Sequence, residues 1–471
     1  MLNDETRGPQ TTMTETTKII AGDALLTMDA GNRVIVDGAV LVEAGRIAAV
    51  GTLAELKVAH PTVAVHKTAD TVLMPGLVNA HAHSGFLRGT AEHLPVWDWL
   101  TLHINPMHRM LQPHEAEAAS WLCYAESLLS GTTTVVDMWR YMEGSAKVAE
   151  AIGNRLVAVP YVGEHPDYDY FDTLDMNEAL IESWHRKADG RVNVWVGLEH
   201  LFYADEAGQR RAIEMAKKHK TGFHTHCSEA EIEVAEFLKR YGKRPMFALE
   251  ELGFFETPLA MIAHGVWIDP SEIEMISTYN VSVAHNPVSN MKLASGIALV
   301  DDMIKAGIAV GIGTDGEKEN NNFDIFEEMK VASLLGKLKD RDAAAMDSWQ
   351  VLRMATILGA KALGLDHEIG SLEVGKRADI IAVRCDTPRM TPFFADGPYF
   401  NLQHNLVHAV RGSDVAMTMV DGKVLVEDGV LKTADIKAII AEIHRVAPGL
   451  FARRADWLAQ NQGGTMQWTK A

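Results

Sequence analysis

Two histidines separated by one residue, His81 and His83, follow an apolar segment over residues 72–78 that reads as a buried strand. Because side chains alternate along a strand, positions i and i+2 point to the same face. Two imidazoles with that spacing can bind one metal ion from a rigid support. The pattern is weak evidence by itself in a chain with 20 histidines, so the prediction depends on what ends the other strands.

Later segments repeat the same alternation of a short apolar strand and an amphipathic helix. The predicted strands cover residues 72–80, 131–138, 154–163, 191–198, 220–227, 259–266, 280–285 and 307–314. Helical patterns, for example over 115–129 and 209–218, lie between them. Continuous apolar runs favour strands covered on both faces. Eight such repeats are typical of an α/β fold of the (β/α)8 TIM-barrel type, whose site lies at the carboxyl ends of the strands.

Nearly every predicted strand ends in a side chain that can titrate or bind a metal ion. These residues are His81, His83, Asp137, Glu164, Glu199, His200, His226, His264, His285 and Asp315. A barrel would bring all of them to one face. Divalent cations such as zinc take imidazole nitrogen and carboxylate oxygen, and catalytic sites keep a position for water. The expected ligands of one divalent metal ion are His81, His83, His226 and Asp315.

Three later residues of the chain, Glu229, His264 and His285, are expected to assist the chemistry. Glu229 lies at the start of the helix that follows His226. Because a metal ion lowers the pKa of bound water, a nearby carboxylate such as Glu229 can take the proton and pass it to a leaving nitrogen. The alternative for Glu229 is a first-turn helix residue favoured by the helix dipole. We expect His264 to contact the attacking water or the developing oxyanion. We expect His285 to orient Asp315 or the substrate.

The fourth predicted strand favours one metal ion over two. A two-metal site would need a bridging group there, usually a carboxylated lysine, and residues 197–200 read Gly-Leu-Glu-His. Zinc is the favoured ion, with iron, cobalt and manganese as alternatives. Cys227 alternates to the other face from His226, so we expect a small buried residue and no ligand.

Composition limits the kinds of partner. The chain has 471 residues, is 47% hydrophobic and carries a formal net charge of −19, which argues against nucleic acid or an anionic membrane. We find no apolar run of about eighteen residues and no signal-peptide pattern, so we expect a cytoplasmic protein with a small-molecule substrate. Three scattered cysteines are too few for a disulfide framework.

Two sets of short strands with Asp-Gly turns frame the predicted barrel, which we place over residues 75–368. They cover residues 17–74 and 369–432, and neither set has enough strands to close a core. We expect them to pair into one small β-sandwich built from both chain ends. Residues 1–16 are expected to be a disordered tail, with Met13 as an alternative start, and residues 433–471 a helical extension.

Seven segments carry a resemblance to a known family. They read MPGLVNAHAH, FLRG, HTHCSE, IAHG, AHNPVSNMKLASGIALV, GIGTDGEKENNN and IGSLEVGKRADII. Over roughly residues 19–431 the chain resembles the amidohydrolase superfamily, in the branch of the triazine hydrolases and the methylthioadenosine/S-adenosylhomocysteine deaminases. The resemblance implies the same four metal ligands, with Glu229 as proton shuttle and His264 near the hydrolytic water. It also implies that His200 faces the substrate and that the protein forms homo-oligomers.

The chain departs from the adenosyl deaminases of that branch where they hold the nucleoside. Those enzymes bind the ribose hydroxyls through a Glu, and the aligned stretch after Trp99 places His108 there. Their carboxylate-binding arginines are replaced by residues 159–161 and the acidic, aromatic stretch 165–171. Aromatic side chains take over, namely Phe86, Trp97, Trp99, Trp139, Tyr161, Tyr168 and Phe202. We therefore expect Phe86, Trp99 and His108 to contact a small planar ligand without a ribose.

Three functions follow as hypotheses. The first is hydrolytic removal of an amine from a neutral N-heteroaromatic of triazine or purine-like type. The second is hydrolysis of a phenylurea or (thio)carbamate that releases an amine, because such hydrolases also resemble this branch. The third is a non-catalytic scaffold, which the complete ligand set argues against. The loop over residues 317–320 is expected to be a solvated rim, with one charge able to close over the site.

Overall fold

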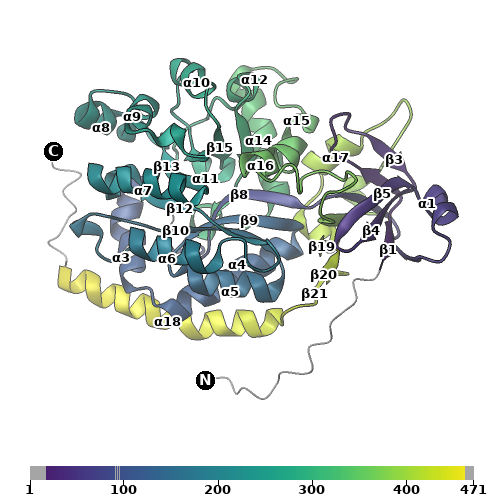
Figure 1. Ribbon diagram of the computed structural model, residues 1–471, viewed down its shortest axis with the longest axis horizontal. Coiled ribbons are helices and arrows are strands. Elements are labelled where there is room, and N and C mark those ends of the chain that lie inside the picture. The colour runs from purple at the N-terminus through teal and green to yellow at the C-terminus, as the bar shows by residue number, and fades with distance from the viewer. Residues whose placement is uncertain (1–16, 91, 93, 95, 462–471) are drawn as a thin grey trace.

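The computed structural model describes residues 17–461 apart from residues 91, 93 and 95. The predicted tail over residues 1–16 and residues 462–471 of the predicted extension lie outside the described residues. Helices and strands alternate through most of the described chain, which gives a mixed α/β fold (Figure 1).

Two five-stranded parallel sheets contain a counterpart of every strand predicted for the barrel. The first has the order β11 (Val192–Val194), β10 (Arg155–Pro160), β9 (Thr132–Trp139), β8 (Leu77–His83) and β17 (Asp315–Gly316). The second has the order β12 (Val196–His200), β13 (Gly222–Cys227), β14 (Leu259–His264), β15 (Val281–His285) and β16 (Ala309–Ile312). Most of these strands are fully buried, as their continuous apolar runs predicted.

Two predicted strands are divided in the structure. The strand predicted over 72–80 breaks at Gly76, so that β7 (Thr71–Pro75) joins a different sheet and β8 begins at Leu77. A Cβ atom at Gly76 would lie 2.3 Å from the side chain of Thr133, so this close approach requires glycine. The strand predicted over 191–198 breaks at Trp195 into β11 and β12, one in each parallel sheet.

A seven-stranded sheet joins the two ends of the chain. Its order is β21 (Val430–Leu431), β20 (Lys423–Glu427), β19 (Val415–Val420), β18 (Ile380–Arg384), β7, β2 (Ala24–Leu26) and β3 (Val34–Val36). A four-stranded sheet has the order β5 (Arg46–Thr52), β4 (Gly38–Glu43), β1 (Lys18–Ala21) and β6 (Ala64–Lys67). One buried cluster, with Ile20, Leu73 and Met419 among its members, contains residues of both sheets. In Figure 1 the purple N-terminal strands lie beside the yellow-green C-terminal strands.

Eighteen α-helices occur in the described chain, and α4 and α7 confirm the helices predicted over 115–129 and 209–218. They are α1 (Leu53–Ala59), α2 (Val96–Trp99), α3 (Asn105–Met110), α4 (Pro113–Leu129), α5 (Met142–Ile152), α6 (Leu174–Trp184), α7 (Glu206–His219), α8 (Glu231–Tyr241), α9 (Pro245–Leu252), α10 (Pro270–Ile276), α11 (Pro287–Lys292), α12 (Val300–Lys305), α13 (Glu317–Asn320), α14 (Ile325–Asp340), α15 (Ser348–Met354), α16 (Ile357–Ala362), α17 (Leu402–His408) and α18 (Ile436–Asn461). The last helix runs along one side of the molecule and packs on α3 and α4 (Figure 1). The Arg453 guanidinium fastens it through hydrogen bonds of 2.6 Å to the Glu115 carboxylate. None of the helices in the described part of the chain is long and apolar enough to cross a membrane.

Candidate active site

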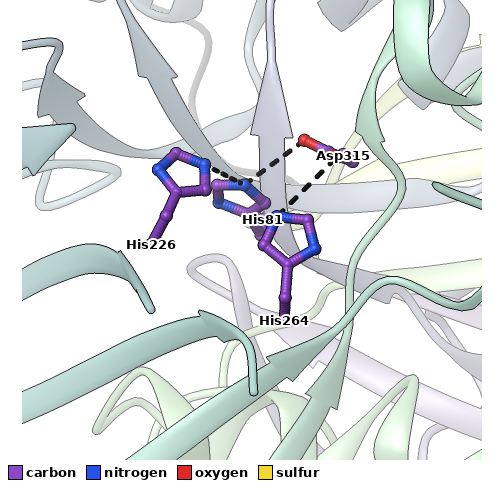
Figure 2. Close-up of side chains that lie close together, drawn as sticks. All are labelled: His81, His226, His264 and Asp315. Atoms are coloured by element: carbon purple, nitrogen blue, oxygen red, sulfur yellow. Dashed lines mark hydrogen bonds and ion pairs between the residues drawn. The ribbon is translucent and has the colours of Figure 1, made fainter. Parts of the chain in front are cut away.

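The expected metal ligands come together at the ends of strands that lie far apart in the sequence. Three of them, His81 from β8, His226 from β13 and Asp315 from β17, each offer one atom within 4.8 Å of the others. His264 from β14, which was not predicted as a ligand, belongs to the same group, and Figure 2 shows the four side chains converging. His83 from β8 joins them, with its Nε2 atom 3.1 Å from His226 Nε2 and 3.2 Å from Asp315 Oδ1. All five side chains are buried.

The spacing of these atoms fits a single cation. His81 Nε2 lies 3.1 Å from His226 Nε2 and 3.4 Å from Asp315 Oδ1. Atoms bound to one zinc ion at about 2.1 Å lie roughly 3.0–3.4 Å apart for angles between about 90° and 109°. Asp315 Oδ1 accepts no hydrogen bond from the described residues although it is buried. A bound cation would satisfy this oxygen.

Hydrogen bonds on the far side of two rings fix which nitrogen faces the cluster. His83 Nδ1 lies 2.6 Å from Met138 O, and His226 Nδ1 lies 2.6 Å from Glu199 O. A carbonyl oxygen can only accept, so each Nδ1 carries the proton and the Nε2 of the neutral ring is a lone pair. Burial holds the pKa of His226 well below its usual value, which keeps that ring neutral. When both rings are neutral, two lone pairs 3.1 Å apart repel each other unless a cation lies between them. Burial lowers the pKa of His83, but the contact with Asp315 outweighs it and raises that pKa, so a proton on His83 Nε2 takes the place of the cation in the metal-free protein.

His81 is oriented by a histidine that the sequence analysis missed. His81 Nδ1 lies 2.8 Å from His224 Nε2, and His224 Nδ1 lies 3.2 Å from Met261 O. Because the Met261 carbonyl accepts, His224 donates through Nδ1 and accepts through Nε2, so His81 donates through Nδ1 and faces the cluster with a bare Nε2. Burial lowers the pKa of His224 to about 3. Its spacing of two residues from His226 was the signal that could have identified it.

Asp315 and His264 have an unusual backbone conformation. Their φ angles are 61° and 70°, in the left-handed region that non-glycine residues rarely adopt. Ser289 Oγ donates to Asp315 Oδ2 at 2.6 Å. Burial alone would raise the pKa of Asp315, but hydrogen bonds from His81 and His83, donated when their Nε2 atoms carry protons, hold it well below its usual value in the metal-free protein. The carboxylate is therefore ionised, as a metal ligand requires.

Glu229 lies beside the cluster. Its Oε2 atom is 3.8 Å from His264 Nε2, which is also 3.8 Å from Asp315 Oδ2. Burial raises the pKa of Glu229. Burial opposes protonation of His264, but the Glu229 and Asp315 carboxylates outweigh it and raise the pKa of the imidazole. The site thus places a buried carboxyl group and an imidazole next to the four predicted ligands.

A cavity opens beside this cluster, and its walls are acidic and aromatic. The carboxyl groups that line it belong to Glu199, Glu229, Glu233, Asp315 and Glu319. The aromatic rings that line it belong to Trp99, Tyr161, Phe202 and Tyr203. No lysine or arginine is among the described residues of the lining. Such walls suit a flat ligand that carries hydrogen-bond donors.

Two of the predicted substrate contacts lie in this cavity. Trp99 and His200 both line it. The two ring nitrogens of His200 are already engaged, because Nδ1 accepts from the Phe202 N–H at 3.2 Å and Nε2 lies 3.1 Å from Glu233 Oε1. His200 therefore presents a fixed ring face and edge to the cavity.

The other predicted contacts lie elsewhere. Phe86 and His108 line a separate apolar cavity with Trp139 and Leu450. The His108 ring stacks on the ring of Tyr161, with centroids 4.6 Å apart. Tyr161 lines the main cavity, so His108 lies one ring behind the wall of that cavity. His285 lines a third cavity. The residue that donates a hydrogen bond to Asp315 Oδ2 is Ser289, where the prediction had expected His285 to orient Asp315 or the substrate. The side chain of Trp97 lies outside the described part of the structure.

The segment over residues 317–320 is buried, so the expectation of a solvated rim was wrong. It forms the short helix α13, in which Glu317 accepts from the Leu87 N–H at 2.9 Å. Lys318 Nζ lies 2.9 Å from Glu319 Oε1, so the two charges compensate each other inside the protein. Glu319, with His83 and Asp315, also offers atoms within 4.8 Å of one another.

Comparison with known proteins defines the class of this chain. The amidohydrolase family matches residues 72–425, and the chain belongs to that family. An imidazolonepropionase-like composite domain of bacteria matches residues 38–62.

Individual relatives agree with the family. A 5-methylthioadenosine/S-adenosylhomocysteine deaminase of Thermoanaerobacter pseudethanolicus is 36% identical over 441 residues, which cover 92% of this chain and 99% of that protein. The structure of an adenosine deaminase from Xanthomonas campestris with bound zinc has a TM-score of 0.86 at 29% identity and covers 93% and 99% of the two chains. A zinc complex of atrazine chlorohydrolase from Arthrobacter aurescens shares the fold, with a TM-score of 0.81 at 24% identity over 91% and 99%. The resemblance stated from the sequence motifs is confirmed.

Proposed function

We propose that this protein is a metal-dependent hydrolase that removes an amine from an amino-substituted N-heteroaromatic compound of triazine or purine-like type. The observation that carries the proposal is the convergence of bare imidazole Nε2 atoms and an ionised carboxylate at separations of 3.1 to 3.4 Å, beside a buried acid–base carboxyl. Two of the relatives described above are named as deaminases, and both of the solved structures described above contain zinc, which supports zinc as the ion.

We assign the metal ion to the histidine Nε2 atoms that carry a lone pair in these tautomers, together with the Asp315 carboxylate. Its ligands are His81, His83, His226 and Asp315. A divalent cation bound there lowers the pKa of water so that a nucleophile is available near neutral pH. His264 Nε2 lies farther away, 3.8 Å from Asp315 Oδ2, which suits a hydrogen-bonding role better than ligation.

Glu229 and His264 carry the proton movements. The Glu229 carboxylate takes a proton from the attacking water and delivers it to the leaving nitrogen. Its burial, which raises the pKa, helps it to hold the proton between these two steps. His264 donates a hydrogen bond to the oxygen of the attacking water, which gains negative charge as Glu229 takes its proton. Water replaces the amino group, so the ring product carries an oxo group and ammonia leaves.

The aromatic walls position the ring. Trp99 and the ring edge of His200 contact the substrate in this proposal. Tyr161 forms another wall and is supported from behind by His108, whose ring stacks on it. Phe86 packs in the same apolar cavity as His108 and contributes to that support.

We further propose that the two parallel sheets form one (β/α)8 TIM barrel over residues 75–368. Backbone hydrogen bonds from Trp195 N to Ala158 O at 2.9 Å and from Glu199 N to Val162 O at 3.1 Å support their junction. Residues 17–74 and 369–432 would form a β-sandwich, a proposal supported by their shared buried cluster. We also propose a C-terminal helical extension over 433–471, a cytoplasmic location and a homo-oligomer; light scattering on the purified protein tests the oligomeric state.

The decisive experiment is substrate profiling of the zinc-loaded enzyme, with the zinc-depleted enzyme as control. Ammonia release from aminotriazines, aminopterins or aminopurines is the expected result. Aniline or alkylamine release from phenylureas or thiocarbamates would replace the proposal by the second hypothesis. If neither set turns over with stoichiometric zinc present, both catalytic hypotheses are overturned.

A further inference from the structure

Two buried carboxyl groups line the active-site cavity without a part in the proposed chemistry. Asp315 binds the metal ion and Glu229 moves the proton. Glu233 is engaged by backbone N–H groups at 2.7 and 2.8 Å and by His200. Glu199 and Glu319 remain, and each is less than a tenth exposed.

Glu199 has an unused oxygen. It ends β12, and its Oε1 atom accepts from the Tyr161 hydroxyl at 3.0 Å. Its Oε2 atom is buried and has no hydrogen-bond partner among the described residues. A buried acceptor without a donor is costly, and an N–H group of a ligand in the cavity would satisfy it.

Glu319 is held in place by a dedicated arrangement. Lys318 Nζ lies 2.9 Å from Glu319 Oε1 and 3.2 Å from Oε2. Gly316 makes room for this pair, because a Cβ atom there would lie 2.2 Å from Glu319 Oε2 and 2.7 Å from Lys318 Nζ. The Lys292 ammonium donates to Lys318 O at 2.9 Å and fastens the short helix. The carboxylate therefore faces the cavity in a fixed orientation.

A second metal ion at Glu319 is a poor explanation. His83, Asp315 and Glu319 do lie close enough together to share an ion. The Lys318 ammonium already compensates the Glu319 charge, and it would repel a divalent cation at that place. The role that remains for the Glu319 carboxylate is to accept a hydrogen bond from a ligand.

We propose that Glu199 and Glu319 determine specificity by selecting substrates that carry, beside the amine removed, an amidine-like edge of N–H donors. Diamino-substituted and cationic N-heteroaromatics have this edge, which can pair with carboxylate oxygens through charge-assisted hydrogen bonds. Rings with only methyl or oxo groups there leave Glu199 Oε2 without a donor, and anionic substrates are repelled. The inference rests on the proposed function for the identity of the cavity as the active site.

A binding experiment tests the subsite without depending on turnover. Benzamidinium and benzamide are planar and nearly isosteric, and they differ in charge and in one NH2 group, which replaces the carbonyl oxygen of the amide. We expect the zinc-loaded enzyme at pH 8 to bind benzamidinium at least about tenfold more tightly by calorimetry. Glu199→Gln and Glu319→Gln should each reduce that ratio about tenfold, whereas Glu206→Gln on the exposed face of α7 should not. Equal binding of the two probes, or an unchanged ratio in both site variants, overturns the inference.

A second measurement uses the wild-type enzyme and keeps the inference testable if a variant fails to fold. 2,4-Diaminopyrimidine and 4-amino-2-methylpyrimidine share the amino group to be removed and differ in the flanking group. We expect kcat/KM to favour the diamino compound at least about tenfold. Turnover of both without preference overturns the specificity inference and leaves the proposed function intact. If no aminoheteroaromatic turns over, the proposed function fails, and the benzamidinium ratio still decides on the subsite.

Discussion

Replacing His224 by Phe tests the argument that a buried histidine fixes the tautomer of a metal ligand. The substitution keeps a planar ring of similar size and removes the nitrogen that accepts from His81 Nδ1 at 2.8 Å. Both histidines are fully buried, so water cannot replace the lost partner without a rearrangement. His81 can then place its proton on Nε2, which would block metal binding.

The expected magnitude follows from the geometry. Loss of one partner that orients a ligand typically weakens metal affinity about 10- to 100-fold, or roughly 1.4 to 2.7 kcal/mol. The buried His81 N–H left without an acceptor costs a further 1–3 kcal/mol or so of stability. We therefore expect a zinc Kd raised by one to two orders of magnitude. Turnover at saturating zinc should change less, because His224 touches neither the cavity nor the proposed proton path.

Competition between the enzyme and a zinc chelator measures this Kd, and nitrogen-15 NMR of the metal-free protein reports the tautomer of His81. His185→Phe is the matched control, because His185 Nδ1 accepts from the Val194 N–H at 3.1 Å and lies away from the metal centre. It should lower stability without changing zinc affinity. A zinc Kd for His224→Phe within twofold of wild type, or the same loss in both variants, would refute the reasoning.

Three further changes probe the centre itself. Glu229→Gln should retain stoichiometric zinc by elemental analysis and lose about 10²- to 10⁴-fold in kcat, since it removes the acid–base group; retained turnover would exclude that role. His83→Ala should lose more zinc affinity than His224→Phe, because it deletes a ligand, and a fully metallated variant after dialysis would contradict the assignment. Burial raises the pKa of Glu199 from 4.5 to about 7, so the folded state binds this proton more tightly than the unfolded state. The free energy of unfolding therefore falls as the pH rises from about 4.5 through 7, because the unfolded state loses the proton first. Urea unfolding of the metal-free enzyme at pH 5 and pH 8 should therefore show Glu199→Gln gaining on wild type by up to about 3 kcal/mol at the higher pH, and a difference independent of pH would count against the shift.

The sequence allowed the strands and the metal centre to be predicted because both follow from local rules. Strand periodicity placed His81 and His83 on one face, and the structure brings both to His226 and Asp315. The convergence of strand ends, which no short motif encodes, was inferred from the repeat alone. The break at Gly76 was missed because it depends on contact with Thr133 from another strand.

The walls of the cavity were less predictable because they depend on packing between distant segments. The charged residues of α13 looked solvent-exposed by composition, yet Glu319 and Lys318 are buried as a pair. His108 occupies a position that suggested substrate contact, but it stacks behind Tyr161 in a neighbouring cavity. A histidine two residues from a proposed ligand is itself a proposed ligand in the case of His83 and a partner of one in the case of His224. His83 is the last residue of β8, whereas His224 lies in the middle of β13, and the sequence alone did not locate these positions.

The turn after β13 explains how the proton-shuttle residue reaches the cluster. Ser228 has a φ of 56°, a left-handed conformation that costs a non-glycine residue about 1–2 kcal/mol. It turns the chain directly after the strand, so that Glu229 Oε2 comes within 3.8 Å of His264 Nε2. The Glu233 carboxylate stabilises this conformation by accepting from the N–H groups of Ser228 at 2.7 Å and Glu229 at 2.8 Å. The aim of the catalytic carboxyl in the proposed mechanism therefore depends on Glu233, whose own orientation is fixed by the imidazole of His200 at 3.1 Å.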